Sequence, residues 1–243
     1  MCEQLLDFHF SNRLKDAGYD SCKALYRFNF NQGDNVVFFG SPDLTKLAER
    51  LMMGSEKAGV KRAIAKEARL AIGRHSHAPD VIAIHRTNWG SGLTDYEIEV
   101  FAFFMEAVAE DAKALCQELL AEGYCLISAG YIEDNEEVLR SFSTRRFKVT
   151  LTKVRSEAFD IHFLDPGEGK ALVSDFLEGK RRFFDLKVTI TAKEHGFVLG
   201  TACQRDLTET IGVTDLSFGG CREELINEAV NQARSVLSAL QAA

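Results

Sequence analysis

The sequence predicts an α+β fold in which an antiparallel sheet, built from β-hairpins, is covered by amphipathic helices. Three observations predict it: segments that alternate apolar and polar residues, turn residues that join such segments in pairs, and apolar stripes at helical spacing after the pairs. Alternation places one face of a sheet on a core and the other toward solvent, which is typical of antiparallel sheets.

The first hairpin is predicted from the alternating residues 24–30, a turn at 31–34 and a second strand at 36–40. Ser41 and Pro42 then predict the start of a helix, with Ser41 as the N-cap and Pro42 at the first helical position. A hairpin followed by a helix is therefore the first unit of the predicted fold.

The same order is predicted again further along the chain. Residues 147–153 alternate strictly and are expected to pair with 159–164, ahead of a short helix over 170–179. The strand KVTLT in this copy closely matches KVTIT in the next copy. The ββα units are therefore either an internal duplication or a common local arrangement that recurs.

A third hairpin is predicted from residues 183–193 and 197–203, and a helix over 222–240 follows it. Apolar residues recur in this helix at steps of three and four, so one of its faces can pack across the sheet. The apolar stripe is also wide enough for a homodimer contact through 222–240. Both roles stay open.

The stretch between the first two hairpins is expected to contain helices over 55–73 and 94–122. Continuous apolar runs predict buried strands at 81–85 and 124–132.

Composition limits the class of protein. The 243 residues carry a net charge of -7, which disfavours a whole-surface attraction to nucleic acid or to an anionic membrane. Six cysteines without a C-x-x-C pair indicate reduced thiols, and no apolar run reaches the roughly 18 residues of a membrane span. The expected location is the cytoplasm.

We interpret residues 1–243 as a single domain, with a candidate subdomain boundary near 140–146.

The helix over 94–122 begins with a capping box formed by Thr94 and Glu97. Its predicted core stripe comprises Ile98, Phe101, Met105, Val108, Ala112, Leu115 and Leu119. Its acidic residues form two flanks, Asp95, Glu99, Glu106 and Glu110 on one side and Glu97, Asp111, Glu118 and Glu122 on the other. Two aromatic residues, Tyr96 and Phe103, lie between these flanks by helical geometry.

Aromatic side chains surrounded by charge are favoured anchors of protein interfaces. A partner-binding surface with a basic protein partner is therefore predicted at Tyr96, Glu99, Phe103, Glu106 and Glu110. The alternative is a solvated acidic face whose two aromatic side chains are tucked under a loop.

A basic segment precedes this helix, over residues 57–86. Arg62, Lys66 and Arg69 are spaced as one stripe of a helix, and Arg74 follows. Such a patch can hold phosphates, so a nucleic-acid-binding module is one hypothesis. The alternative is a solvated face that pairs with the acidic helix within the fold.

Histidines cluster directly after the basic residues. His75 and His77 would point to one side of an extended segment, and Asp80 and His85 could add further ligands for zinc or manganese. A metal-dependent hydrolase or nuclease is the corresponding hypothesis. An H-x-H pair also arises by chance, in which case the protein holds no cofactor.

The sequence contains no P-loop, nucleophile elbow or kinase motif. The favoured hypothesis is therefore an interaction protein without catalytic activity, which acts as an inhibitor, adaptor or regulator through its charged helical surface. An extension of this hypothesis is a protein of a phage or mobile element that blocks a nucleic-acid-binding machine, because a carboxylate-lined surface can compete for a site that holds phosphates.

Overall fold

The computed structural model describes residues 2–75, 78–156, 158–213 and 217–242, with backbone alone at 74–75, 78–81 and 242. The chain divides into two compact units. The N-terminal unit is Leu6–Tyr124, and the C-terminal unit joins Met1–Leu5 to Cys125–Ala243. Each unit contains one four-stranded antiparallel sheet, so the predicted α+β fold of hairpins and helices is confirmed.

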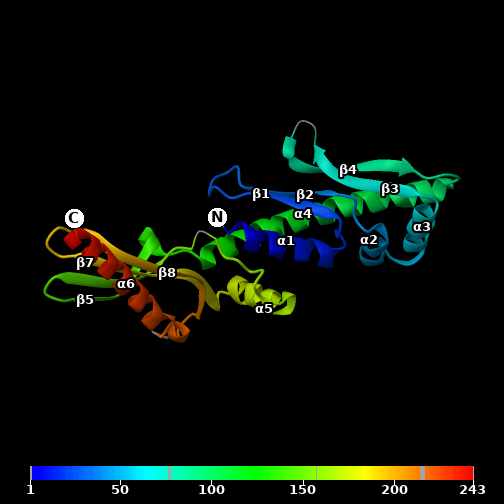
Figure 1. Ribbon diagram of the computed structural model, residues 1–243. Helices are drawn as coiled ribbons and strands as arrows, with labels where there is room; N and C mark the ends of the chain where they lie inside the picture. The colour runs from blue at the N-terminus through cyan, green and yellow to red at the C-terminus, as the bar shows by residue number, and fades with distance from the viewer. Residues whose placement is uncertain (1, 76–77, 157, 214–216, 243) are drawn as a thin grey trace. The chain divides into compact units, whose positions relative to one another are not determined.

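The N-terminal unit contains, in chain order, most of α1 (Glu3–Ala17), then β1 (Cys22–Arg27), β2 (Asn35–Gly40), α2 (Leu44–Leu51), α3 (Gly54–Ala65), β3 (Ala68–His75), β4 (Ala78–Trp89) and most of α4 (Asp95–Ala129) (Figure 1). The first residues of α1 and the last residues of α4 belong to the C-terminal unit. The sheet has the order β1-β2-β3-β4, and β2 is joined to β3 through the pairing of Gly40 with Ile72. Aromatic side chains fill the core, among them Phe10, Phe28, Phe38 and Phe101.

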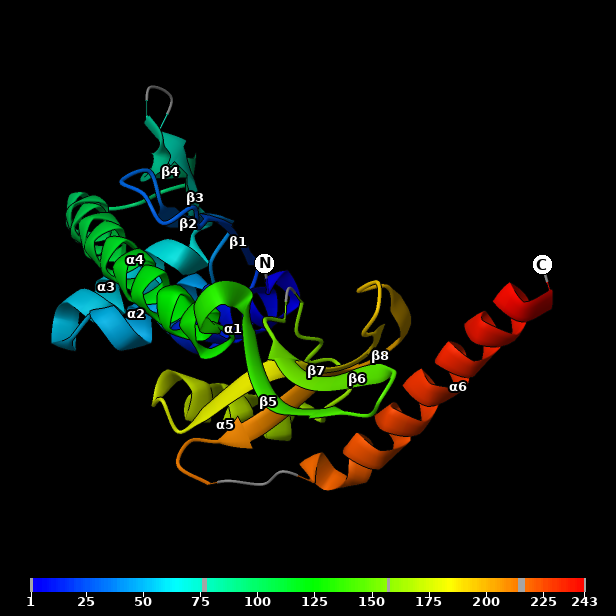
Figure 2. The same cartoon turned by 90° about the vertical axis from the view of Figure 1, so that its left-hand side faces the viewer.

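The C-terminal unit contains η1 (Glu133–Asn135), β5 (Glu136–Ser143), β6 (Phe147–Val154), α5 (Pro166–Leu177), β7 (Arg181–Ala192), β8 (Val198–Thr210), η2 (Phe218–Gly220) and α6 (Cys221–Ala242) (Figure 2). Its sheet has the order β5-β6-β7-β8. The predicted C-terminal helix is confirmed as α6, which buries Leu225, Ala229 and Ala233 against this sheet.

Each of the four hairpins is followed by a helix: β1–β2 by α2, β3–β4 by α4, β5–β6 by α5 and β7–β8 by α6. The predicted hairpin–helix order is therefore present in both units. The candidate boundary at 140–146 falls in the β5–β6 hairpin. The matching strands KVTLT and KVTIT are direct neighbours in the sheet, since Leu151 pairs with Val188.

Several local predictions are wrong. The N-cap of α2 is Asp43 and not Ser41, because the Asp43 carboxylate accepts hydrogen bonds from the amides of Thr45 and Lys46, both at 3.0 Å. The helix predicted over 55–73 ends at Ala65. Glu67 then has a φ of 68°, which turns the chain out of the helix and into β3.

The strand predicted at 124–132 is the end of α4, which buries Leu126 and Ile127. Residues 159–164 form no strand. The centroid of the Phe159 ring lies 5.7 Å from that of Phe176 and 4.9 Å from that of Phe183, so this residue packs in the core of the unit. The strand partners of β6 are β5 and β7 instead of residues 159–164. None of the described helices is both long and apolar enough to cross a membrane.

Candidate interaction surface on helix α4

The start of α4 has the predicted capping box. The amide of Glu97 donates to Oγ1 of Thr94 at 3.3 Å, and the amide of Thr94 donates to Oε2 of Glu97 at 2.9 Å. The buried stripe contains Phe101, Val108, Ala112, Leu115 and Leu119, as predicted. Ile98 was assigned to this stripe wrongly, because the buried face turns toward Val100 and Phe104 and leaves Ile98 39% exposed.

One acidic flank of α4 is paired within the N-terminal unit. Glu97 is buried, and its carboxylate lies 2.7 Å from Nζ of Lys66 and 3.2 Å from Nε of Arg62. The hydrogen bond from Lys66, with that from the Thr94 amide, lowers the pKa of Glu97 to about 2. Asp111 accepts two hydrogen bonds from Arg50, at 2.5 and 2.6 Å, and one from the Tyr19 hydroxyl at 2.6 Å.

The same flank continues toward the end of the helix. Arg13 of α1 donates to Glu118 at 2.6 Å and to Glu122 at 3.1 Å. Nε2 of His9 also lies 2.7 Å from Glu122. Burial raises the pKa of Glu122, but the bonds with His9 and Arg13 outweigh it and leave the pKa lowered. This flank therefore stabilises the packing of α4 against α1, α2 and α3.

The carboxylates of the other acidic flank of α4 are not engaged in this way. Asp95, Glu99, Glu106 and Glu110 are exposed, and within the described part of the chain none of their side chains has an ion pair or a hydrogen bond. Tyr96 is 42% exposed and Phe103 is 53% exposed beside them. We call these six residues, together with Ile98, the acidic face.

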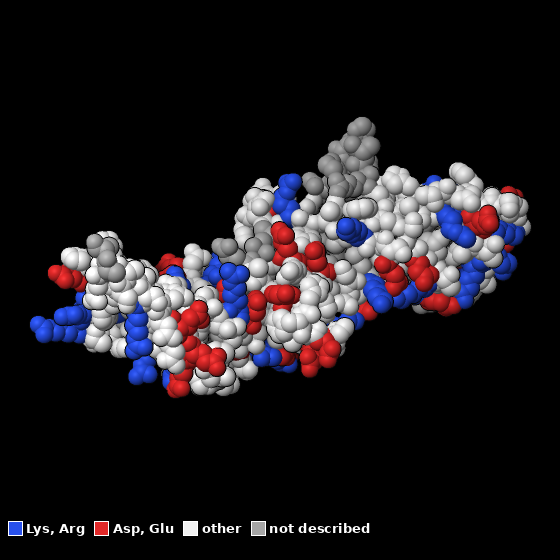
Figure 3. Space-filling model, in the orientation of Figure 1, with Lys and Arg blue, Asp and Glu red and all other residues white. Residues whose placement is uncertain are grey.

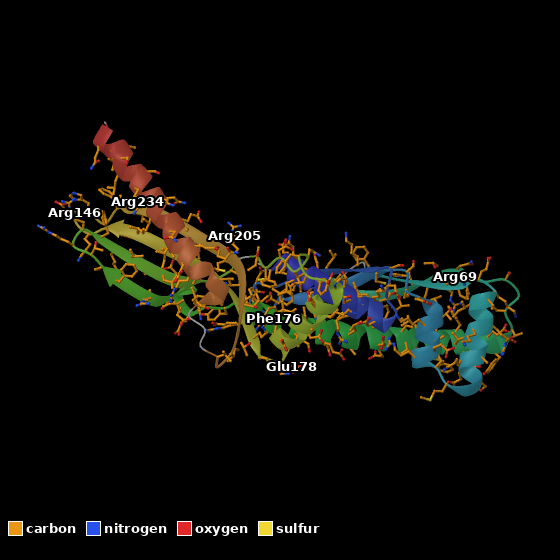
Figure 4. The ribbon with its side chains drawn as sticks, turned by 60° about the horizontal axis from the view of Figure 1, so that its bottom comes forward. Arg69, Arg146, Phe176, Glu178, Arg205 and Arg234 are labelled. Atoms are coloured by element: carbon orange, nitrogen blue, oxygen red, sulfur yellow. The ribbon has the colours of Figure 1, made fainter. Side chains whose placement is uncertain are left out.

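The basic segment, residues 57–86, forms most of α3, all of β3 and the first part of β4, and several of its cations pair within the fold. Lys57 and Lys61 both pair with Glu49, and Arg62 and Lys66 pair with Glu97. The predicted stripe of three is not one helical stripe, because Arg69 belongs to β3 (Figure 4). Its Nη1 donates to the carbonyl oxygens of Ile64 and Ala68 at 2.7 and 2.8 Å. The side chain of Arg74 lies outside the described residues.

The predicted metal ligands His75, His77 and Asp80 also lie outside the described side chains. His85 is exposed on β4, opposite Ala71 of β3. Where side chains are described, no group of three or more His, Cys, Asp or Glu is arranged to hold a metal ion.

The C-terminal unit contains one charged cluster that was not predicted from the sequence. Arg145 and Arg146 in the β5–β6 turn, Lys148 of β6 and Lys193 after β7 are exposed, and the amide of Lys193 donates to the carbonyl oxygen of Arg146 at 2.8 Å. We call these four residues the basic tip. Basic side chains gather at this end of the unit in Figure 3. The run RRFK was available as a signal, although Arg145 and Arg146 were assigned to the candidate boundary and Lys148 to the predicted strand 147–153.

Comparisons of the chain with protein-family models, curated proteins and solved structures find no match.

Proposed function

We propose that this chain is an interaction protein without catalytic activity, and that the acidic face of α4 binds a protein partner with a basic surface. The observation that supports it most strongly is the difference between the two acidic flanks of one helix. The carboxylates of one flank form ion pairs with basic side chains of the same unit. The carboxylates of the other flank, Asp95, Glu99, Glu106 and Glu110, form no ion pair with any described residue.

The exposed aromatic side chains add a second reason. Phe103 lies between Glu99 and Glu106, one turn away on either side of the helix, and it is 53% exposed. An exposed phenylalanine contributes apolar area to an interface, and the surrounding carboxylates select partners of opposite charge and accelerate association. Helix α3 packs closely against one side of the Tyr96 ring, because a Cβ added to Gly59 of α3 would lie only 3.1 Å from this ring.

A partner of this chemistry presents lysine or arginine side chains around an apolar patch. Such surfaces occur on proteins that bind phosphates, because those proteins need cations at the same positions. The role of an inhibitor or regulator follows from this proposal, since an occupied basic surface is closed to its phosphate ligand.

The test is affinity capture from extracts of the native host, followed by titration of the captured protein in solution. We expect the unchanged chain to capture a protein with a basic surface, with an affinity that falls as salt is raised. Glu99→Lys combined with Glu106→Lys, and separately Phe103→Ala, should each abolish capture.

The matched control is Glu133→Lys combined with Glu136→Lys, which makes the same change in charge at exposed positions of the C-terminal unit. This control should capture the partner as well as the unchanged chain does. Equal binding by the Glu99→Lys, Glu106→Lys variant, or no captured protein at all, would contradict the proposal.

A further inference from the structure

The sheet of the C-terminal unit has two different faces. Through one face, Val149, Leu151, Val188 and Ile190 pack against α6 in a shared core. The residues between them in each strand point to the opposite face, because successive side chains of a strand alternate.

A row of hydroxyl groups crosses this opposite face. Ser141 pairs with Thr150, Thr150 with Thr189, and Thr189 with Thr201, so the row runs through all four strands. Residues directly opposite one another in an antiparallel pair share a face. We call this row the hydroxyl ladder. Ser141 is exposed and the three threonines are half-buried.

The basic tip borders the ladder. Lys148 pairs with Ser143 on one side and Thr191 on the other, one row closer to the hairpin turns than the ladder. Arg145, Arg146 and Lys193 follow in the turns themselves. Arg146 lies at this end of the strands in Figure 4, whereas Phe176 of α5 lies at the other end, where it packs on Phe183.

The cations of the basic tip are not held in ion pairs by the residues that the structure describes. Where the structure describes the chain, Arg145, Arg146, Lys148 and Lys193 have no carboxylate partner, and Lys193 reaches only the carbonyl oxygen of Thr144 at 3.5 Å. Asp185 of β7 pairs with Val154, at the opposite end of the β6–β7 pair from Lys148, and accepts a hydrogen bond from the Asp206 amide at 3.1 Å.

We propose that the basic tip and the hydroxyl ladder together bind the phosphate backbone of a nucleic acid. Cations provide the attraction to phosphates, and hydroxyl groups donate hydrogen bonds to phosphate oxygens. The net charge of -7 does not oppose this locally, because at about 0.1 M salt charges beyond roughly 10 Å are largely screened. The proposal is independent of the acidic face of α4.

The test is a titration of the full chain with a fluorescent 20-nucleotide probe of mixed sequence, as a single strand and as a duplex, at several salt concentrations. We expect binding in about the micromolar range at low salt, with an affinity that falls steeply as salt increases. Arg145→Gln combined with Arg146→Gln should weaken binding about tenfold or more and reduce the slope of log affinity against log salt by about 2.

Two further variants separate the contributions. Thr150→Val combined with Thr189→Val keeps β-branched side chains in the strands and removes two hydroxyl groups, so it should weaken binding without changing the salt slope. Lys23→Gln combined with Lys113→Gln is the matched charge control, since both lysines are exposed in the N-terminal unit. It should leave binding unchanged.

Three results would overturn the proposal. The first is the absence of binding to either form of the probe. The second is an equal loss in the Lys23→Gln, Lys113→Gln control, which would indicate a diffuse effect of charge. The third is equally tight binding to poly-glutamate or to vesicles of anionic phospholipid, which would indicate attraction to any polyanion.

Discussion

Nζ of Lys66 lies 2.7 Å from Oε2 of Glu97, and this ion pair joins the basic segment to the acidic helix. Both residues belong to clusters that the sequence presents as separate surfaces. Glu97 is buried, so the pair contributes to the packing of α3 and α4 and is not free for a ligand. One interpretation of the basic segment was that its cations pair with the acidic helix inside the fold. This pairing is observed for Arg62 and Lys66, which both contact Glu97.

The first prediction concerns the pH dependence of stability. The pKa of Glu97 is lowered in the folded protein from an ordinary value of 4.5 to about 2, so the unfolded chain binds its proton more readily. The stabilisation is fully present above the unfolded pKa and is lost as the pH falls toward the folded pKa. Glu97→Gln should lower the melting temperature by an amount that is constant above about pH 5.5 and shrinks below it.

Thermal unfolding followed by circular dichroism between pH 3 and 8 measures this difference. Glu136→Gln, at an exposed position of β5, is the control and should show no such pH dependence. A melting difference for Glu97→Gln that is the same at all pH values would mean that its charge contributes nothing.

Gly123 shows why part of the fold cannot be predicted from the sequence. A glycine in this position is typical of a helix end, and the continuous apolar run beyond it predicts a buried strand over 124–132. In the structure α4 continues, and a Cβ at Gly123 would lie 2.2 Å from the ring of Phe28. The reason for the glycine is a contact with a residue far away in the chain, which no local pattern contains.

The second prediction follows from this contact. Gly123→Ala should destabilise the chain by about 1–3 kcal/mol through overpacking, although alanine is the better helix former. Gly167→Ala is the matched control, since Gly167 lies in the first turn of α5 with no atom within 4 Å of its added Cβ. It should be neutral or slightly stabilising. Urea unfolding midpoints measure both effects, and a neutral Gly123→Ala would contradict the close contact.

Elements could be predicted where their own residues contain the pattern that forms them. Elements were missed where that pattern is absent or where the structure depends on residues distant in the chain. The turn residues at 31–34 and 194–196 mark hairpins directly, and the period of α6 is visible in its own residues. The strand β5 was missed because it is an edge strand with nearly every residue exposed, so it has no alternation. The two acidic flanks of α4 look alike in sequence because their difference depends on Arg13 and Arg50, which are distant in the chain.

The third prediction compares two neighbouring phenylalanines of α4. Phe101 is 1% exposed, and Phe101→Ala should cost about 3–5 kcal/mol of unfolding free energy. Phe103 is 53% exposed, and Phe103→Ala should change stability by less than about 0.5 kcal/mol. Chemical denaturation measures both. A large loss of stability in Phe103→Ala would place this side chain in the core and remove it from the acidic face.

The fourth prediction uses cysteine reactivity to examine the path of α4. Cys116 is half-buried, and burial raises its pKa from 9.0 to about 12, while a hydrogen bond with the Phe38 backbone opposes the shift weakly. Burial similarly raises the pKa of Cys22 to about 12. A shift of this size reduces the thiolate fraction at neutral pH by about 1000-fold, and the thiolate is the reactive form.

Cys125 is exposed on the part of α4 that was expected to be a strand, with the buried residues Leu126 and Ile127 directly after it. We therefore expect iodoacetamide at pH 8 to label Cys125 much faster than Cys22 or Cys116. Peptide mapping by mass spectrometry gives the three rates, and labelling in denaturant should make them equal, which shows that the difference comes from the fold. Protection of Cys125 comparable to that of Cys116 would contradict the observed direction of its side chain and thus the continuation of α4 as a helix.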